Sequence, residues 1–303
     1  MNILLIGGNG FIGSHLVDKL LSNGHHVRVF DIAGERYRKP LQEVDYRISS
    51  LDNIPDLYEA LLGIDIVFYL ASSSVPSTSN IDTVSDVNSN LIPALNVLNL
   101  LVKLKIQRIV YFSSGGAVYG NPLTALISEE HVLNPISSYG IVKVTIERYL
   151  FLYQRMYDLK PLILRPSNPY GPRQGHFIAQ GVISTFLRKA NLNEPITVFG
   201  DGNSTKDYIF IRDLIDLSYE LSLSEEVGVF NLGSGVGTSI NTIIDQINEE
   251  TGYNLLVNNV DKQIYDVNNF VLDISKVKNV LGEYSLTSLN KGISETWKWL
   301  VSK

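Results

Sequence analysis

The chain has 303 residues, of which 45% are hydrophobic and 18% charged, and its formal net charge is −6. This length and composition suffice for one large folded domain or two closely joined ones, and they exclude a disordered or fibrous chain. The acidic balance argues against nucleic-acid binding, which relies on clustered cations. The sequence contains no cysteine, which excludes disulfides and thiolate chemistry, and its five histidines show no ligand spacing, so we predict no metal site.

The first residues, MNILLIGG, run directly into a strand and a glycine turn, so we expect no signal peptide. The densest apolar stretch, LNVLNLLVKLKI, is interrupted by Asn and Lys and falls short of the roughly 20 apolar residues that a membrane span needs. We therefore expect a cytoplasmic protein without a membrane span.

Short apolar runs alternate with amphipathic stretches along the first half of the chain. In order they are the strand NILLIG, the helix FIGSHLVDKLLSNG, the strand HVRVFD, the strand DIVFYLA, a helix over 90–105 and the strand RIVYFSS. A helix over SSYGIVKVTIERYLFLYQRMY and the strand PLILRPSN follow. Continuous apolar strands separated by helices predict an α/β fold, a Rossmann-type doubly wound parallel sheet.

After about Pro166 the chain becomes rich in Gly, Pro and Asn, with short helices and strands. This change predicts a smaller C-terminal α/β lobe over 166–303, which follows the first domain over 1–165. The sequences YIFIRD and VGVFNLGSG read as strands that rejoin the first domain, so we expect a returning segment near 205–235.

Three glycines lie between the first strand and the first helix. Gly7, Gly10 and Gly13 let the backbone turn tightly and approach a pyrophosphate, whose charge then meets free amides at the helix start. Asp31 ends the second strand, about 20 residues on, where an acid accepts the ribose hydroxyls of a dinucleotide and repels a 2'-phosphate. This pattern predicts NAD rather than NADP, although Arg28, Arg36 and Arg38 lie nearby in sequence and leave the choice open.

Tyr139 and Lys143 stand four residues apart in SSYGIVK, which places both side chains on one face of a helix. A phenol titrates near pH 10 and is a poor base, but a neighbouring ammonium and a positive nicotinamide stabilise its phenolate. We therefore predict that Tyr139 transfers a proton.

Taken together, these motifs resemble the extended short-chain dehydrogenase/reductase family of nucleotide-sugar epimerases, dehydratases and reductases, in particular enzymes like UDP-glucose 4-epimerase. The resemblance covers nearly the whole chain. Its pieces are GGNGFIGSHL, VFYLAS, the helix from Asn90, FSSGGAVYG, SSYGIVK, LRPSNPYGPRQ, FGDGNSTKDYIFIRD and NLGSGVG.

The resemblance implies that the first domain binds NAD, that the C-terminal lobe binds a sugar nucleotide, and that Tyr139 is the general acid/base whose pKa Lys143 lowers. Asn90 is implied to lie beside the cofactor, with a helix cap as the alternative. The implied cofactor-binding residues are Gly7, Gly10, Phe11, Ile12, Gly13, Asp31, Ile32, Ser50, Leu51, Leu70, Ala71, Asn90, Ser113, Tyr139, Lys143 and Pro166. The implied substrate-binding residues are Ser73, Ser114, Tyr139, Asn168, Arg173, Phe199 and Lys206.

The sequence departs from the family pattern beside the proposed proton donor. A Ser or Thr usually stands four residues before the Tyr of V-Y-G, and here that position is Gly115. We predict that Ser114 polarises the substrate oxygen instead, as a third catalytic residue, and that Ser113 caps the backbone or contacts the cofactor.

Other departures concern the binding of the cofactor and the diphosphate. The usual acid after the third strand is missing, which leaves Ser50 and the Leu51 backbone to meet the adenine, and Tyr69 stands where His is common. Lys206 and Gln263 replace two arginines that often hold the diphosphate. Either Arg173 or Arg188 replaces the positive charge of these two arginines, or the substrate carries a different phosphoryl group. For Arg173 itself, the two interpretations are a contact to a phosphate and a loop cap.

These residues favour an NAD-dependent nucleotide-sugar 4-epimerase. The alternatives are a 4-ketoreductase of a 4-keto-6-deoxy sugar nucleotide and a catalytically silent dinucleotide-binding protein. A 4,6-dehydratase is disfavoured because Gly116 and Ala117 replace its Asp-Glu pair. The resemblance also implies polysaccharide biosynthesis and a homodimer paired through the helices at 90–105 and 138–157. The alternative is that the apolar faces of these helices pack on the sheet.

Overall fold

The computed structural model describes residues 1–175, 181–261 and 269–302. The chain divides into two compact units, and each is assembled from separate stretches of sequence. The first unit comprises Met1–Gly120, Leu133–Arg165 and Ile215–Phe230, and the second comprises Asn121–Val132, Pro166–Leu214 and Asn231–Lys303.

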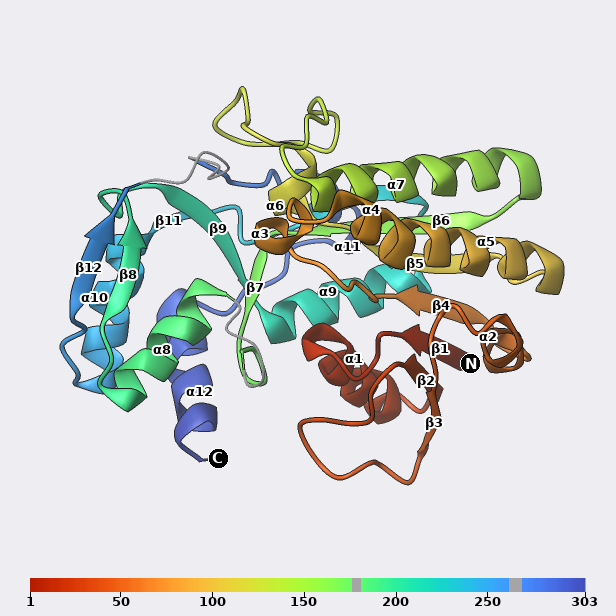
Figure 1. Cartoon of the computed structure of the whole chain (residues 1–303), viewed down its shortest axis with the longest axis horizontal. Helices are drawn as coiled ribbons and strands as arrows, with labels where there is room; N and C mark the ends of the chain where they lie inside the picture. The colour runs from red at the N-terminus through yellow and green to blue at the C-terminus, as the bar shows by residue number, and fades with distance from the viewer. Residues whose placement is uncertain (176–180, 262–268, 303) are drawn as a thin grey trace. The chain divides into compact units, whose positions relative to one another are not determined.

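The first unit is built on a seven-stranded sheet of order β10-β6-β5-β4-β1-β2-β3 (Figure 1). The neighbouring strands from β6 to β3 all pair in parallel. Because the strand order reverses between β1 and β4, the predicted doubly wound Rossmann-type fold is confirmed. The strands are β1 (Asn2–Ile6), β2 (His26–Asp31), β3 (Val44–Ile48), β4 (Ile66–Tyr69), β5 (Arg108–Phe112), β6 (Lys160–Pro166) and β10 (Gly228–Leu232).

Helices cover both faces of this sheet because successive side chains of its strands point to opposite faces. In β1, Leu4 and Ile6 belong to a buried cluster with residues of three helices, whereas Ile3 and Leu5 face the other side. The three helices of that cluster are α2 (Ile54–Leu61), α5 (Ile92–Leu104) and α7 (Ser138–Tyr157). On the other face lie α1 (Phe11–Ser22) and α9 (Ile211–Leu223), which an ion pair of 2.7 Å joins from Lys19 to Asp216 (Figure 1).

Short helices occupy the loops at the carboxyl ends of β4 and β5. They are α3 (Pro76–Ser79), α4 (Thr83–Asp86), the π-helix η1 (Val87–Leu91) and α6 (Gly115–Val118). The helix predicted over 90–105 therefore begins as a π-helix, whose widened turns are frequent at functional sites. The helix predicted from SSYGIVK onward is α7.

The second unit contains two small sheets and a group of helices. β7 (Asn168–Tyr170), β9 (Thr205–Phe210) and β11 (Gly237–Ser239) form one sheet, and β8 (Ile196–Phe199) pairs with β12 (Val257–Val260) in the other. The buried carboxylate of Asp207 accepts hydrogen bonds from the backbone of Ser234, Gly235 and Leu272 and thereby ties their loops together. The helices are α8 (Val182–Leu192), α10 (Ile240–Thr251), α11 (Ser275–Leu281) and α12 (Leu289–Val301).

The units differ in two places from the domains expected from the sequence. The segment that returns to the first unit is Ile215–Phe230, shorter than the expected 205–235, and residues 121–132 belong to the second unit. Backbone hydrogen bonds explain the second difference, because Ile127 exchanges them with Val271 and Asp273, far along the chain. Of the helices that the structure describes, none combines the length and apolar character needed to span a bilayer.

Candidate active site

The turn between β1 and α1 accepts only glycine at two of its three predicted positions. Gly7 has a φ of +86°, and a Cβ there would lie 2.7 Å from the backbone nitrogen of Ala71. A Cβ on Gly13 would lie 2.5 Å from the carbonyl oxygen of Gly7. Gly10 is the N-cap of α1, and no side chain caps this helix start. The amides of its first turn, at Phe11, Ile12 and Gly13, are therefore available to an anion. This cradle fits a pyrophosphate.

Asp31, at the end of β2, is bound to the same turn. Its Oδ2 accepts a hydrogen bond of 3.0 Å from the amide of Asn9, and its Oδ1 accepts one of 3.2 Å from the amide of Ala33. The Oδ1 atom of Asn9 is buried and has no hydrogen-bond partner within the described residues, which leaves an acceptor for a ligand. Asp31 and the glycine turn thus form one polar surface, while the neighbouring Ile32 is 72% exposed.

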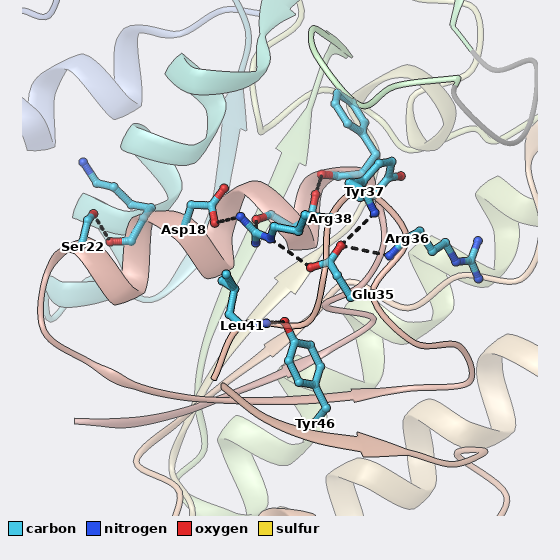
Figure 2. Close-up of polar contacts among 11 residues, drawn as sticks. Asp18, Ser22, Glu35, Arg36, Tyr37, Arg38, Leu41 and Tyr46 are labelled. Atoms are coloured by element: carbon cyan, nitrogen blue, oxygen red, sulfur yellow. Dashed lines mark hydrogen bonds and ion pairs between the residues drawn. The ribbon is translucent and has the colours of Figure 1, made fainter. Parts of the chain in front are cut away.

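Two of the three arginines near Asp31 are engaged elsewhere, as Figure 2 shows for Arg38. The guanidinium of Arg38 binds Asp18 on α1 and donates a hydrogen bond of 3.2 Å to Glu35. Arg28 donates to Asp45 over 2.7 Å and to backbone carbonyls. Because these cations already have carboxylate partners, the surroundings of Asp31 favour a ribose hydroxyl over a 2'-phosphate. Arg36 is exposed on the same loop.

The remaining cofactor-binding candidates of the first unit continue from this surface along the carboxyl ends of the strands. The amide of Ser49 donates to the carbonyl of Asp31 over 2.9 Å, which brings Ser50 and Leu51 next to the end of β2. The amides of Leu70 and Ala71 donate to Ile6, beside Gly7. The structure therefore brings the turn after β1 together with residues that follow β2, β3 and β4 in the sequence.

Tyr139 and Lys143 lie on the first two turns of α7. The Nζ atom of Lys143 donates a hydrogen bond of 2.8 Å to the carbonyl of Phe112 and lies 5.5 Å from the centroid of the Tyr139 ring. Both side chains line a small cavity of about 10 Å³, enough for one water molecule, together with Ala71 and Asn90. The two side chains share one helix face, as their spacing predicts.

Burial dominates the electrostatics of this pair. It raises the pKa of Tyr139 to about 12, although a hydrogen bond from Ser114 favours the phenolate and opposes this shift. Burial lowers the pKa of Lys143 to about 8, although the negative charges of Glu147 and Asp86 act to raise it. In the chain alone Tyr139 is therefore a neutral phenol at neutral pH, and a further positive charge is needed to favour its phenolate.

Ser113 and Ser114 play different structural parts. The Ser114 hydroxyl reaches Tyr139, next to Gly115, which stands where the family usually has Ser or Thr. The Ser113 hydroxyl instead donates to the buried carboxylate of Glu147, which also binds Arg165. A contact from Ser113 to the cofactor stays a prediction.

Asn90 lies inside η1, so its interpretation as a helix cap is wrong. Its Oδ1 accepts a hydrogen bond of 2.9 Å from the amide of Ser73, and its Nδ2 donates 2.8 Å to Asp86. Sequence reasoning missed Asp86, which lines the same cavity. The available signal was the spacing of Asp86 and Asn90, four apart and therefore on one helix face.

The other substrate-binding candidates belong to the second unit, and their role stays a prediction. Asn168 donates 2.7 Å to the carbonyl of Asp207, Phe199 is 47% exposed at the end of β8, and Lys206 lies on β9. Arg173 follows β7 with a φ of +75°. Pro166 ends β6 and is buried, Arg188 lies on α8, and Gln263 falls outside the described residues.

A model of the NAD dependent epimerase/dehydratase family matches residues 3–233. The chain is 30% identical to UDP-glucose 4-epimerase of Mycolicibacterium smegmatis, over 100% of this chain and 99% of that protein. It is 32% identical to dTDP-4-dehydro-6-deoxyglucose reductase of Escherichia coli, over 98% and 96% of the two chains.

Solved structures agree with these relatives. UDP-glucose 4-epimerase of Thermotoga maritima, with UDP-glucose, superimposes with a TM-score of 0.94 at 32% identity and covers 100% of this chain and 99% of its own. UDP-glucose 4-epimerase of Thermus thermophilus, in complex with NAD, gives a TM-score of 0.93 at 28% identity over 99% of both chains.

Proposed function

Because the chain belongs to the NAD dependent epimerase/dehydratase family and is thus an NAD-dependent sugar-nucleotide enzyme, we propose that it is a 4-epimerase of UDP-linked hexoses or N-acetylhexosamines. The observation that carries the proposal is the grouping of Ser114, Tyr139 and Lys143 within the first unit, beside the loop of Leu70 and Ala71. An epimerase needs one proton-transferring group at C4 and no further acid or base.

NAD, when bound, supplies the chemistry of taking a hydride from C4 of the sugar and returning it. The glycine cradle would hold its pyrophosphate, Asp31 would bind its adenosine ribose, and Lys143 would bind its second ribose. Tyr139 accepts the proton of the C4 hydroxyl and later gives it back. Ser114 donates a hydrogen bond to the same oxygen, and the Lys143 ammonium favours the phenolate of Tyr139.

A 4-ketoreductase of a dTDP-linked 4-keto-6-deoxy sugar is the second candidate, favoured by the 32% identity to the reductase of Escherichia coli. It requires the same side chains, used once per cycle, with a reduced cofactor that enters and leaves. Gly116 and Ala117 of α6 carry no acid, which disfavours a 4,6-dehydratase.

The test is incubation of the purified protein with UDP-glucose, UDP-galactose and their N-acetylamino forms, without added cofactor, followed by chromatography of the products. We expect interconversion of at least one C4 pair, and its loss in Tyr139→Phe. Failure of every pair, together with oxidation of NADH or NADPH by a 4-keto-6-deoxy sugar nucleotide, would establish the reductase instead.

A further inference from the structure

Asp86 is a buried carboxylate beside the candidate catalytic pair, and the proposed proton transfer does not use it. Only 3% of the residue is exposed. It ends α4 at the start of η1, and its side chain lines the cavity that Tyr139 and Lys143 also line. Burying a carboxylate is costly unless hydrogen bonds or a cation compensate, so its retention here calls for a physical role.

Three segments of the first unit meet at this carboxylate. Its Oδ1 accepts hydrogen bonds from the Ser74 hydroxyl at 2.5 Å and from the Asn90 amide at 2.8 Å. Its Oδ2 accepts one of 2.6 Å from the hydroxyl of Ser138, which immediately precedes Tyr139. Asp86 therefore connects the loop after β4, the π-helix and the first turn of α7.

The three donors to Asp86 are neutral, and within the described residues no cation forms an ion pair with it. The titratable groups that face it are Tyr139 and Lys143 of α7. Lys143 also faces Glu147 on its own helix and the ring of Tyr111 on β5, at 5.0 Å. Arg165 binds Glu147 in a buried ion pair, which partly offsets the charge of Glu147, whereas among the described residues no ion pair offsets that of Asp86.

We propose that Asp86 is a positioning residue that fixes the Asn90 amide and the start of α7 and whose negative charge keeps the Lys143 ammonium protonated beside Tyr139. The site then contains a counter-charge for Lys143 that comes from a separate element of the fold. This inference deepens the proposed function, but its electrostatic part concerns the chain alone and holds for any reaction that uses the pair.

The sign of the effect follows from the opposing influences on Lys143. Burial favours the neutral amine, while Glu147 and, to a smaller extent, Asp86 favour the ammonium. Replacing Asp86 by the nearly isosteric Asn removes one of these anions, so the amine should lose its proton at lower pH. With an effective dielectric near 20, removing a charge at roughly 6 to 12 Å predicts a decrease of about one to two pH units in the Lys143 midpoint.

The experiment is an NMR titration of lysine side chains labelled with ¹³C at Cε, in protein freed of cofactor, with the Lys143 signal identified by its loss in Lys143→Met. Asp86→Asn is compared with two controls. Asp82→Asn removes the exposed carboxylate that caps the same helix α4, and Ser138→Ala removes one donor to Asp86 without changing any charge.

We expect the titration midpoint of Lys143 to fall in Asp86→Asn and to stay in place in both controls. Turnover of Asp86→Asn should also decline at a lower pH than that of the wild type on the alkaline side. An unchanged Lys143 midpoint in folded Asp86→Asn overturns the proposal. Because this titration needs no substrate, it gives the same answer whether the enzyme is an epimerase or a reductase.

Discussion

The burial of Lys143 opposes its positive charge, and this makes the free energy of unfolding depend on pH. Its pKa falls from 10.5 in the unfolded chain to about 8 in the folded one. Between these values the unfolded chain binds more protons, so the contribution of Lys143 to stability rises with pH across this range and is lost as pH falls through about 8. Lys143→Met removes this dependence.

We therefore expect the free energy of unfolding of Lys143→Met, relative to wild type, to decrease steadily between pH 8 and 10.5. Urea unfolding at several pH values measures this difference. Parallel pH profiles for the two proteins would mean that folding does not lower the pKa of Lys143.

Ser114 allows a second prediction at this scale. Its hydroxyl reaches Tyr139, while Gly115 has no side chain to do so. Ser114→Ala should lower kcat by about 100-fold, as removal of a preorganised donor does in other enzymes, with little change in bound NAD. Restoration of activity by adding a hydroxyl with Gly115→Ser in the Ser114→Ala background supports a role at the substrate oxygen. A Ser114→Ala variant with full kcat would show that another group polarises that oxygen.

The glycine turn between β1 and α1 should determine how firmly the protein retains its cofactor. A methyl group on Gly13 would lie 2.5 Å from the Gly7 carbonyl, so Gly13→Ala must displace the turn that presents the first amides of α1. We expect the variant to be purified with little or no NAD. Gly34→Ala is the matched control, because a Cβ there meets nothing within 4 Å. Equal NAD content in the two variants would argue against the cradle.

The sequence predicted some elements better than others, for physical reasons. α7 was predictable because its apolar positions recur with the helical period and Ser137 caps it through the Gly140 amide. η1 was not, since a π-turn keeps almost the same apolar pattern and differs in hydrogen bonding. Asp86 was missed for a different reason: apart from its spacing to Asn90, its role depends on Ser74 and Ser138, which lie far from it in sequence.

At the scale of the whole molecule, the chain passes between its two units several times. One of these crossings, at 165/166, lies where the composition changes near Pro166. The crossings at 120/121 and 132/133 depend on backbone pairing of Ile127 with residues beyond 270, and local sequence carries no such information. Because each unit is discontinuous in sequence, we expect a fragment of residues 1–165 to lack β10 and to unfold more readily than the full chain.

A 4-epimerase returns the hydride that it removes from C4 to C4 of the same sugar. The direct measurement uses UDP-glucose and UDP-N-acetylglucosamine carrying deuterium at C4, incubated with the enzyme and an excess of free unlabelled NAD, followed by mass spectrometry of the product. We expect a C4-inverted product that keeps the deuterium. Loss of the label to the free cofactor pool during turnover would contradict this expectation.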